Sequence, residues 1–202
     1  MEPTNIKISF KIQTVPLSTV QESCSSLGYK LKRFANFLVV RPFASAKEGP
    51  SWVCTVFKKN LAGEVPQHVN VTNIKSFDEI EVVTSYLANL KLIALPGTVN
   101  IDNVTGLMHA GKLILYEVVK HIQVRKNQVC ENLSLKFPGV HTLSVHYNNE
   151  RFPGLFIKFK KNKSKFGTAI VFHSGKIVII GCKCLSQLRW IAGAVSVLIS
   201  IK

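Results

Sequence analysis

The sequence predicts an α+β fold made of two similar halves, and two observations lead to this prediction. First, the order strand, helix, four strands, helix is predicted in residues 1–95 and again in residues 96–202. Second, segments of the two halves match: KRFANFLVV at residues 32–40 corresponds to ERFPGLFIK at residues 150–158. A repeated order together with repeated residues indicates an internal duplication, so we expect two repeats of one structural unit.

The first half is predicted to open with a strand and a short helix. The strand covers about residues 5–15, and the helix runs to about Leu27, because Ser18–Gln21 has the spacing of a capping box. Extended segments follow between Pro, Gly and charged residues, the first counted as two strands joined by a turn: 29–41, 52–59 and 67–75. A second capping box at residues 76–79 introduces an amphipathic helix.

The second half is predicted to repeat this order with different loop lengths. It contains a strand, a helix, four strands and a closing helix at about 98–107, 113–124, 140–147, 152–160, 168–173, 176–183 and 185–199. Residues 126–138 fit neither the helical nor the strand period. The apolar run over residues 190–201 is too short to span a bilayer, so we assign it to a core helix.

The chain is strongly basic, with 26 basic and 11 acidic residues and a net charge of +15. Such a charge is typical of proteins that bind nucleic acid or an anionic membrane surface, although it also serves solubility. The basic residues are not gathered on one amphipathic helix, which disfavours a membrane surface. Five cysteines at irregular spacing do not form a disulfide pattern, so we expect reduced thiols in an intracellular protein without a signal peptide.

The sequence contains no motif that predicts catalysis. There is no phosphate-binding loop, and no histidine has a carboxylate or cysteine partner at a diagnostic spacing. Cys182 and Cys184 are separated by one residue, which is too short a spacing for the usual pair of zinc ligands, and the sequence contains no second pair to complete such a site. We therefore predict no catalytic residues, no metal site and no cofactor.

Several predicted strands are apolar on both faces, as in AIVF at residues 169–172 and IVII at residues 177–180. Two helices in each half can cover only one face of a sheet, and the other face then needs a second layer of strands or a bound partner. Too little of the chain remains for a second layer, which favours an exposed apolar face. Cations that suit phosphate binding edge this face: Lys32, Arg33, Lys75, Lys158, Lys160, Lys176 and Lys183.

These residues match a known family. RFPGLFIKF at residues 151–159 and AIVFHSGKIVIIGCK at residues 169–183 closely resemble the second repeat of the TATA-box-binding protein core. KRFANFLVV, TVFKKN and VNVTNIK resemble its first repeat. The resemblance implies a saddle with about ten antiparallel strands and with helices on the convex face. It also implies that the concave face binds the minor groove of DNA and kinks the duplex.

The resemblance further implies which residues contact DNA. Four phenylalanines correspond to the wedges that enter between base pairs: Phe34, Phe57, Phe152 and Phe172. The residues that contact bases, or that lie beside the wedges, correspond to Asn5, Asn103, Thr72, Ala35 and Pro153. Cations that hold phosphates correspond to Lys32, Arg33, Lys75, Lys158, Lys176 and Lys183. Each of these residues, taken alone, also fits an ordinary role in a core, a turn or a solvated surface.

The sequence departs from the family in three places. Lys7 and Asn70 replace valines on the DNA face, and Ile180 stands where a partner of Thr72 is expected, so we expect an altered base preference near the centre of the site. An insertion is expected within residues 111–138. Before Phe152, Glu150 keeps one of two glutamates that meet transcription factor IIB, but Asn148 replaces the other. This divergence favours a source such as a large DNA virus or an early-branching eukaryote.

The sequence thus predicts a transcription initiation factor that binds AT-rich promoter DNA and has no catalytic activity. The resemblance implies partners similar to transcription factors IIA and IIB and RNA polymerase, no membrane, and a location in the nucleus or a viral factory. The alternative is a module that binds a nucleic-acid substrate for a repair enzyme or a ribonuclease-H-type system, since such proteins carry domains of similar fold.

Overall fold

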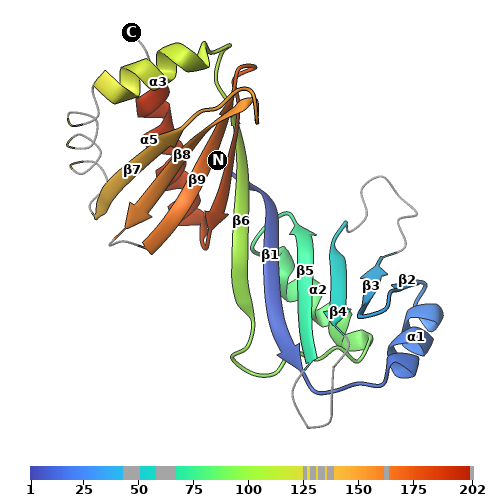
Figure 1. Cartoon of the computed structure of the whole chain (residues 1–202). Helices are drawn as coiled ribbons and strands as arrows, with labels where there is room; N and C mark the ends of the chain where they lie inside the picture. Colours follow the sequence, from blue (N-terminus) through green and yellow to red (C-terminus); the bar gives the residue numbers. More distant parts are fainter. Residues whose placement is uncertain are drawn as a thin grey trace. The chain divides into compact units, whose positions relative to one another are not determined.

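A computed structural model describes residues 1–42, 51–57, 67–124, 139–161 and 164–200, together with residues 127, 131 and 135. The chain divides into two compact units (Figure 1). The first unit comprises residues 4–102, and the second unit comprises residues 103–202 together with residues 1–3. The division at residues 95 and 96 expected from the sequence stays a prediction of where one repeat ends and the other begins.

The first unit is an antiparallel sheet with helices at its side. Its elements are β1 (Pro3–Ile12), α1 (Leu17–Ser26), β2 (Lys30–Arg33), β3 (Phe37–Arg41), β4 (Val53–Phe57), β5 (Gln67–Ile74) and α2 (Glu79–Asn89). The strands lie in the order β2-β3-β4-β5-β1, and every neighbouring pair is antiparallel. Figure 1 shows α2 lying behind β5.

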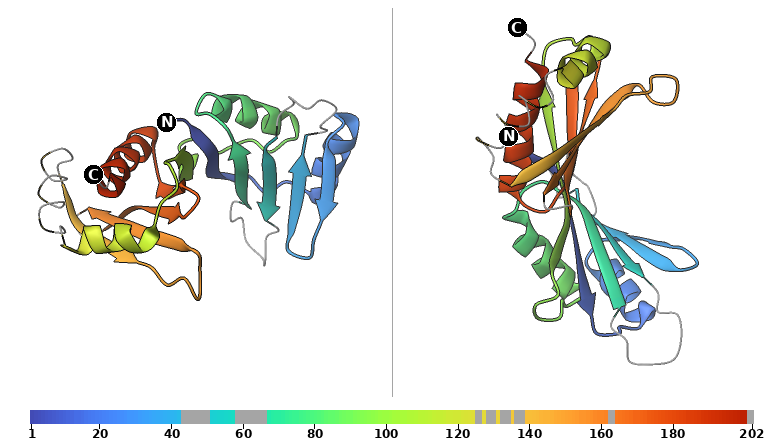
Figure 2. Two further views of the ribbon diagram at one scale, coloured as in Figure 1. Left: turned by 90° about the horizontal axis from the view of Figure 1, so that it is seen from above. Right: turned by 60° about the vertical axis from the view of Figure 1, so that its left-hand side comes forward.

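The second unit has the same construction. Its elements are β6 (Asn100–His109), α3 (Leu115–Val124), β7 (Val140–His146), β8 (Gly154–Lys161), β9 (Ser164–Phe172), β10 (Lys176–Cys182) and α5 (Leu185–Ile199). The strands lie in the order β6-β10-β9-β8-β7, again antiparallel throughout. Helix α5 packs against β9 and β10, and both views of Figure 2 show it along one side of the strands.

Alternating side chains divide each sheet into a helix-covered face and an open face. On β1, Ile6, Ile8 and Phe10 are buried, whereas the residues between them are half-buried. The same alternation occurs on β10, where Ile177 and Ile179 are buried. The ten described strands all belong to these two sets of five, so the sandwich considered from the sequence is not found among the described residues.

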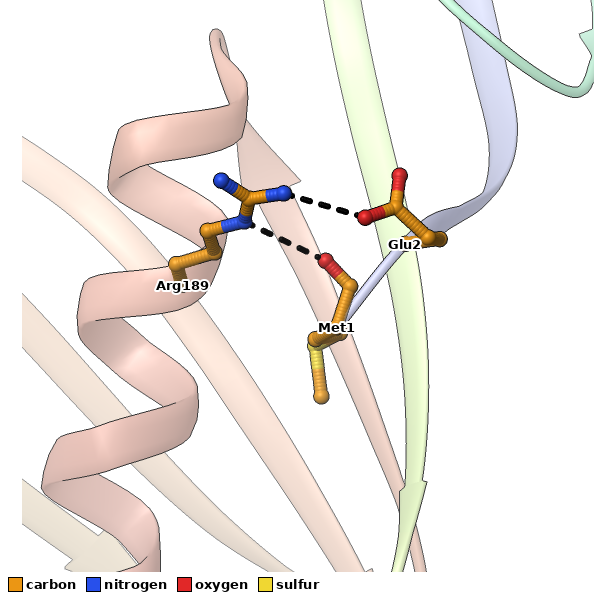
Figure 3. Close-up of polar contacts among 3 residues, drawn as sticks. All are labelled: Met1, Glu2 and Arg189. Carbon is orange, nitrogen blue, oxygen red and sulfur yellow. Dashed lines mark hydrogen bonds and ion pairs between the residues drawn. The ribbon is translucent and has the colours of Figure 1, made fainter.

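The first three residues of the chain belong to the second unit, and Arg189 on α5 binds Met1 and Glu2 (Figure 3). The Arg189 guanidinium donates from Nε to the carbonyl oxygen of Met1 (3.5 Å) and from Nη2 to Oε1 of Glu2 (3.0 Å). The ion pair with Glu2 is exposed, so its contribution to stability is small, about 0–1 kcal/mol.

The α+β class, the two repeats and the order of elements predicted from the sequence are confirmed. The two capping boxes had different outcomes. Ser76 Oγ accepts the Glu79 N–H (3.3 Å), and the Glu79 carboxylate accepts the Lys75 N–H (2.5 Å), so the second box forms with the N–H of Lys75 as donor in place of that of Ser76. The first box is wrong: α1 begins at Leu17, after Pro16, and Ser18 lies inside its first turn.

Two other sequence predictions meet the limits of the described residues. Within residues 111–138, where the insertion is expected, residues 111–124 are described and include the predicted helix α3, whereas most of residues 125–138 lie outside the described residues. The four described cysteines, Cys24, Cys54, Cys182 and Cys184, are unpaired. No helix in the described part of the chain is long and apolar enough to cross a membrane.

Burial should separate the described cysteines by reactivity. Cys184 is exposed, whereas desolvation raises the pKa of Cys24 to about 11, of Cys182 to about 12, and of Cys54 in the same direction. The thiolate is the nucleophile. In a Cys130→Ser background at pH 8, iodoacetamide should therefore modify Cys184 first, and the other three only upon unfolding, as measured by peptide mass spectrometry.

The same three thiols should make the fold less stable at high pH. Their pKa values in the folded state lie above the ordinary value of 9.0, so their contribution to the free energy of unfolding is complete below pH 9 and is lost as the pH rises toward 11–12.

In the alkylation experiment, rapid modification of Cys54 in the folded protein at pH 8 would contradict the packing of β4 described here.

Candidate nucleic-acid interface

Directly opposite residues on neighbouring strands share a face of the sheet, so the strand registers define rows of side chains on each open face. One row crosses the second unit from β6 to β7: Leu107, Val178, Ile170, Phe156 and His146. The equivalent row crosses the first unit from β1 to β2: Ser9, Asn70, Thr55, Val39 and Lys32. Each open face is therefore a continuous surface rather than a cleft.

In the second unit, two of the predicted wedges meet at one end of the open face. The rings of Phe152 and Phe172 lie 5.9 Å apart, and Phe156 lies 5.1 Å from Phe152. Gly154 is directly opposite Phe172, and a Cβ on it would lie 2.6 Å from Cε1 of Phe152. The missing side chain at Gly154 thus makes room for the Phe152 ring, which is 37% exposed.

The first unit builds its aromatic end differently. Phe34 and Phe57 are each 38% exposed, as expected for wedges, but a third ring, Phe37, contacts both of them. Phe37 stacks on Phe34 at 4.5 Å and lies 6.2 Å from Phe57, which it directly faces across the strands. By strand register, Phe37 faces Phe57 as Gly154 faces Phe172, so Phe37 is the structural equivalent of Gly154. The match of residues 32–40 with residues 150–158 instead aligns Phe37 with Leu155.

Sequence reasoning missed Phe37 and Phe156 as members of these aromatic clusters. Both alternate with buried residues on their strands, Leu38 for Phe37 and Leu155 and Ile157 for Phe156. That alternation was visible in the sequence. What was not visible is the strand register, which brings each ring beside a wedge.

Asn5 and Asn103 have matching positions in the two units. Asn5 Oδ1 accepts the backbone N–H of Asn73 (2.8 Å), and Asn103 Oδ1 accepts that of Gly181 (2.7 Å). Both donors lie where the strand register shifts, in the left-handed region, with φ of 66° at Asn73 and 83° at Gly181. Each amide also carries Nδ2 hydrogens that it can donate, and Nδ2 of Asn103 donates to Oγ1 of Thr105 (3.1 Å).

The six predicted phosphate-binding cations are all exposed. Lys32 Nζ lies 5.2 Å from the centre of the Phe34 ring, which couples a cation to a wedge. Lys75 Nζ donates to the Thr4 carbonyl (3.2 Å) and to Asn73 Oδ1 (2.5 Å). The other four are Arg33, Lys158, Lys176 and Lys183. Ala35 and Pro153 are exposed next to the wedges, and Thr72 is half-buried opposite Val53.

Asp102 is a charged residue of the first unit that sequence reasoning did not identify. Its carboxylate accepts a hydrogen bond from Ser9 Oγ (2.9 Å) and forms an ion pair with Lys7 (3.3 Å). Asp102 and Ser9 are 93 positions apart in sequence, so no local pattern indicated the pair. Within the described residues, no group of three or more metal-ligating side chains is found.

Three comparisons with known proteins bear on this surface. A family model described as transcription factor TFIID, or TATA-binding protein, matches residues 128–198. The TATA-box-binding protein of Methanosphaera stadtmanae is 41% identical over 56 residues, which is 27% of this chain and 29% of that protein. The solved structure of Methanococcus jannaschii TBP matches with a TM-score of 0.60 and 20% identity, over 98% of this chain and 97% of that one.

The sequence likeness to the TATA-binding-protein family thus covers residues 128–198, and the chain as a whole shares the fold of a solved TBP. The sequence match spans less than a third of the curated relative's own length. The match to the family model lies in the second half of the chain and includes Phe152, Lys158 and Phe172. For the first unit, the likeness is one of fold alone.

The exposed position of the wedges predicts how their removal affects stability. Phe159 is fully buried and packs edge-on against Trp190 (5.6 Å), whereas Phe152 is 37% exposed. Phe159→Ala should lower the unfolding free energy by about 3–5 kcal/mol and the Tm by roughly 10 °C. Phe152→Ala should lower the Tm by only about 3 °C in the same thermal melt. Equal losses would place Phe152 in the core.

Proposed function

We propose that this protein is a transcription initiation factor that binds duplex DNA in the minor groove and bends it with its two aromatic clusters. The observation that carries the proposal is that each unit ends its open face in partly exposed phenylalanines: Phe34 and Phe57 in one, Phe152 and Phe172 in the other. Apolar rings that enter a base step compensate for its unstacking by opening a larger contact with the bent duplex.

Charge supports the same proposal. The chain carries a net charge of +15, and both units present exposed cations, among them Lys32 and Arg33 in the first and Lys158 and Lys176 in the second. Cations that contact phosphates position a protein on DNA and supply most of its sequence-independent affinity. The Nδ2 hydrogens of Asn5 and Asn103 would then donate to the acceptors that adenine and thymine present in the minor groove.

The relatives support the same role. The curated relative is named a TATA-box-binding protein, and we extend AT-rich promoter DNA as the ligand, and the absence of catalysis, to this chain. Partners similar to transcription factors IIA and IIB and RNA polymerase belong to the proposal, as does action on DNA in the nucleus or a viral factory.

The turn before Phe152 bears on the IIB-like partner. Asn148 Oδ1 accepts the N–H groups of Glu150 (3.2 Å) and Arg151 (3.4 Å), and the Asn148 carbonyl accepts that of Phe152 (3.0 Å). Asn is well suited to such a turn, because its side chain caps the following backbone. At this position the turn presents Glu150 as the acidic group available to a partner.

DNA binding by this mode should depend strongly on salt. Release of counterions from about six phosphates predicts a slope of roughly −5 for log K against log salt concentration. Lys158→Ala should make the slope shallower by about 1 and weaken all duplexes alike, because phosphate contacts carry no sequence information. Fluorescence anisotropy from 50 to 300 mM salt measures both. A slope near zero would exclude the groove mode.

The wedges should be needed for bending more than for folding. In a fluorescence-transfer assay on an AT-rich duplex, Phe172→Ala should reduce both the bend and the affinity, because unstacking a base step loses its compensation of a few kcal/mol. Phe152→Ala should act in the same way, and Tyr116→Ala on the exposed side of α3 is the matched aromatic control. If the folded Phe172→Ala protein bent DNA normally, Phe172 would not be one of the wedges.

The same assay tests the alternative function, a substrate-binding module of a repair enzyme or a ribonuclease-H-type system. Such a module would prefer an RNA–DNA hybrid or a damaged duplex, whose geometry differs from that of B-form DNA. Aromatic clusters in both units favour the bending factor instead. Tighter binding to the hybrid, without bending of the DNA duplex, would support the alternative.

A further inference from the structure

The open faces of the two units differ in polarity at equivalent positions. In the first unit, Asn70 on β5 directly faces Ser9 and Thr55. In the second unit, Val178 on β10 has the same place and faces Leu107 and Ile170. The middle of one row is therefore polar across three strands, whereas the middle of the other is aliphatic across three strands.

The contacts of Asp102 leave the Ser9 oxygen in the polar row free to accept hydrogen bonds. Ser9 Oγ donates its hydrogen to Asp102 Oδ1 (2.9 Å), so the lone pairs of this oxygen are left to accept. Lys7 lies 3.3 Å from the other Asp102 oxygen, and both side chains are about one-third exposed, at 36% and 31%. The ammonium offsets the carboxylate charge, which would otherwise repel DNA phosphates.

Base pairs differ in what they require of such a row. In the minor groove, A·T and T·A pairs present only acceptors, whereas a G·C pair adds the N2 amino group of guanine, which is a donor. Against an aliphatic row this amino group is buried without a partner, which is unfavourable. Against the polar row it meets the Ser9 hydroxyl oxygen and the Asn70 amide oxygen.

We infer that the first unit reads a half-site containing a G·C pair, that the second unit reads A·T pairs, and that Asn70 is the residue that determines this difference. The inference rests on the proposed binding of duplex DNA and names the class of site that the protein selects. Asn70 carries it because Asn70 is half-buried in the middle of the row, with an acceptor on the side chain. Val178→Asn and Asn70→Val then exchange the two rows at one position each.

The test compares duplexes with no guanine, with one G·C pair in one half, and with one G·C pair in each half. A duplex can be bound in either orientation, so the wild type should place its first unit on the half with guanine. It should bind the duplex with one G·C pair most tightly and the duplex with two about fivefold or more weakly. The Asn70→Val protein should bind the duplex without guanine most tightly. The Val178→Asn protein should also bind the duplex with one G·C pair in each half.

Inosine isolates the amino group, because an inosine·C pair lacks the N2 amino group of G·C. Replacing guanine by inosine in the duplex with one G·C pair should weaken the wild type about fivefold and leave Asn70→Val unchanged. The inference is overturned if the wild type prefers the duplex without guanine, or if inosine has no effect on a duplex that is bound and bent. If no duplex is bound at all, the proposed function itself has failed.

Discussion

The structure of each unit depends on one constraint: the helices of a unit cover only one face of its five strands. On that face the side chains are fully buried, as Ile6, Ile8 and Phe10 are on β1. The other face must then combine apolar side chains with exposure to solvent, which soluble proteins rarely tolerate over a broad area. A ligand that covers this face removes the conflict, and the cations around it indicate that the ligand carries negative charge.

The aromatic ends differ between the units because of one local residue. In the second unit, Gly154 leaves space for the Phe152 ring, which lies beside Phe172. In the first unit, Phe37 fills that space, and the ring of Phe34 stacks on it instead. Packing of the rings therefore orients the exposed phenylalanines in both units, but through different neighbours.

The elements could be predicted from the sequence, and the four candidate wedges could be named, because their signals are local or repeated. Period-2 strands, the capping box at Ser76 and the matching segments around Phe34 and Phe152 all lie within short windows. The first capping box failed because Pro16 already opens α1, so Ser18 falls inside the helix. The Phe37 and Asp102 contacts could not be predicted, because each depends on the register of strands that are distant in sequence.

The pattern of differences between the units separates what folding requires from what a ligand selects. Buried equivalents keep the same chemistry, as for Val69 and Ile177, or Val71 and Ile179, because a polar group there would lose its hydrogen bonds to water. The open-face residues between them change class, from Asn70 to Val178 and from Thr72 to Ile180. Folding alone does not require the open-face residues to change class, since the buried residues of the same strands keep theirs. We therefore expect the polarity of the open face to be selected by what binds there rather than by folding.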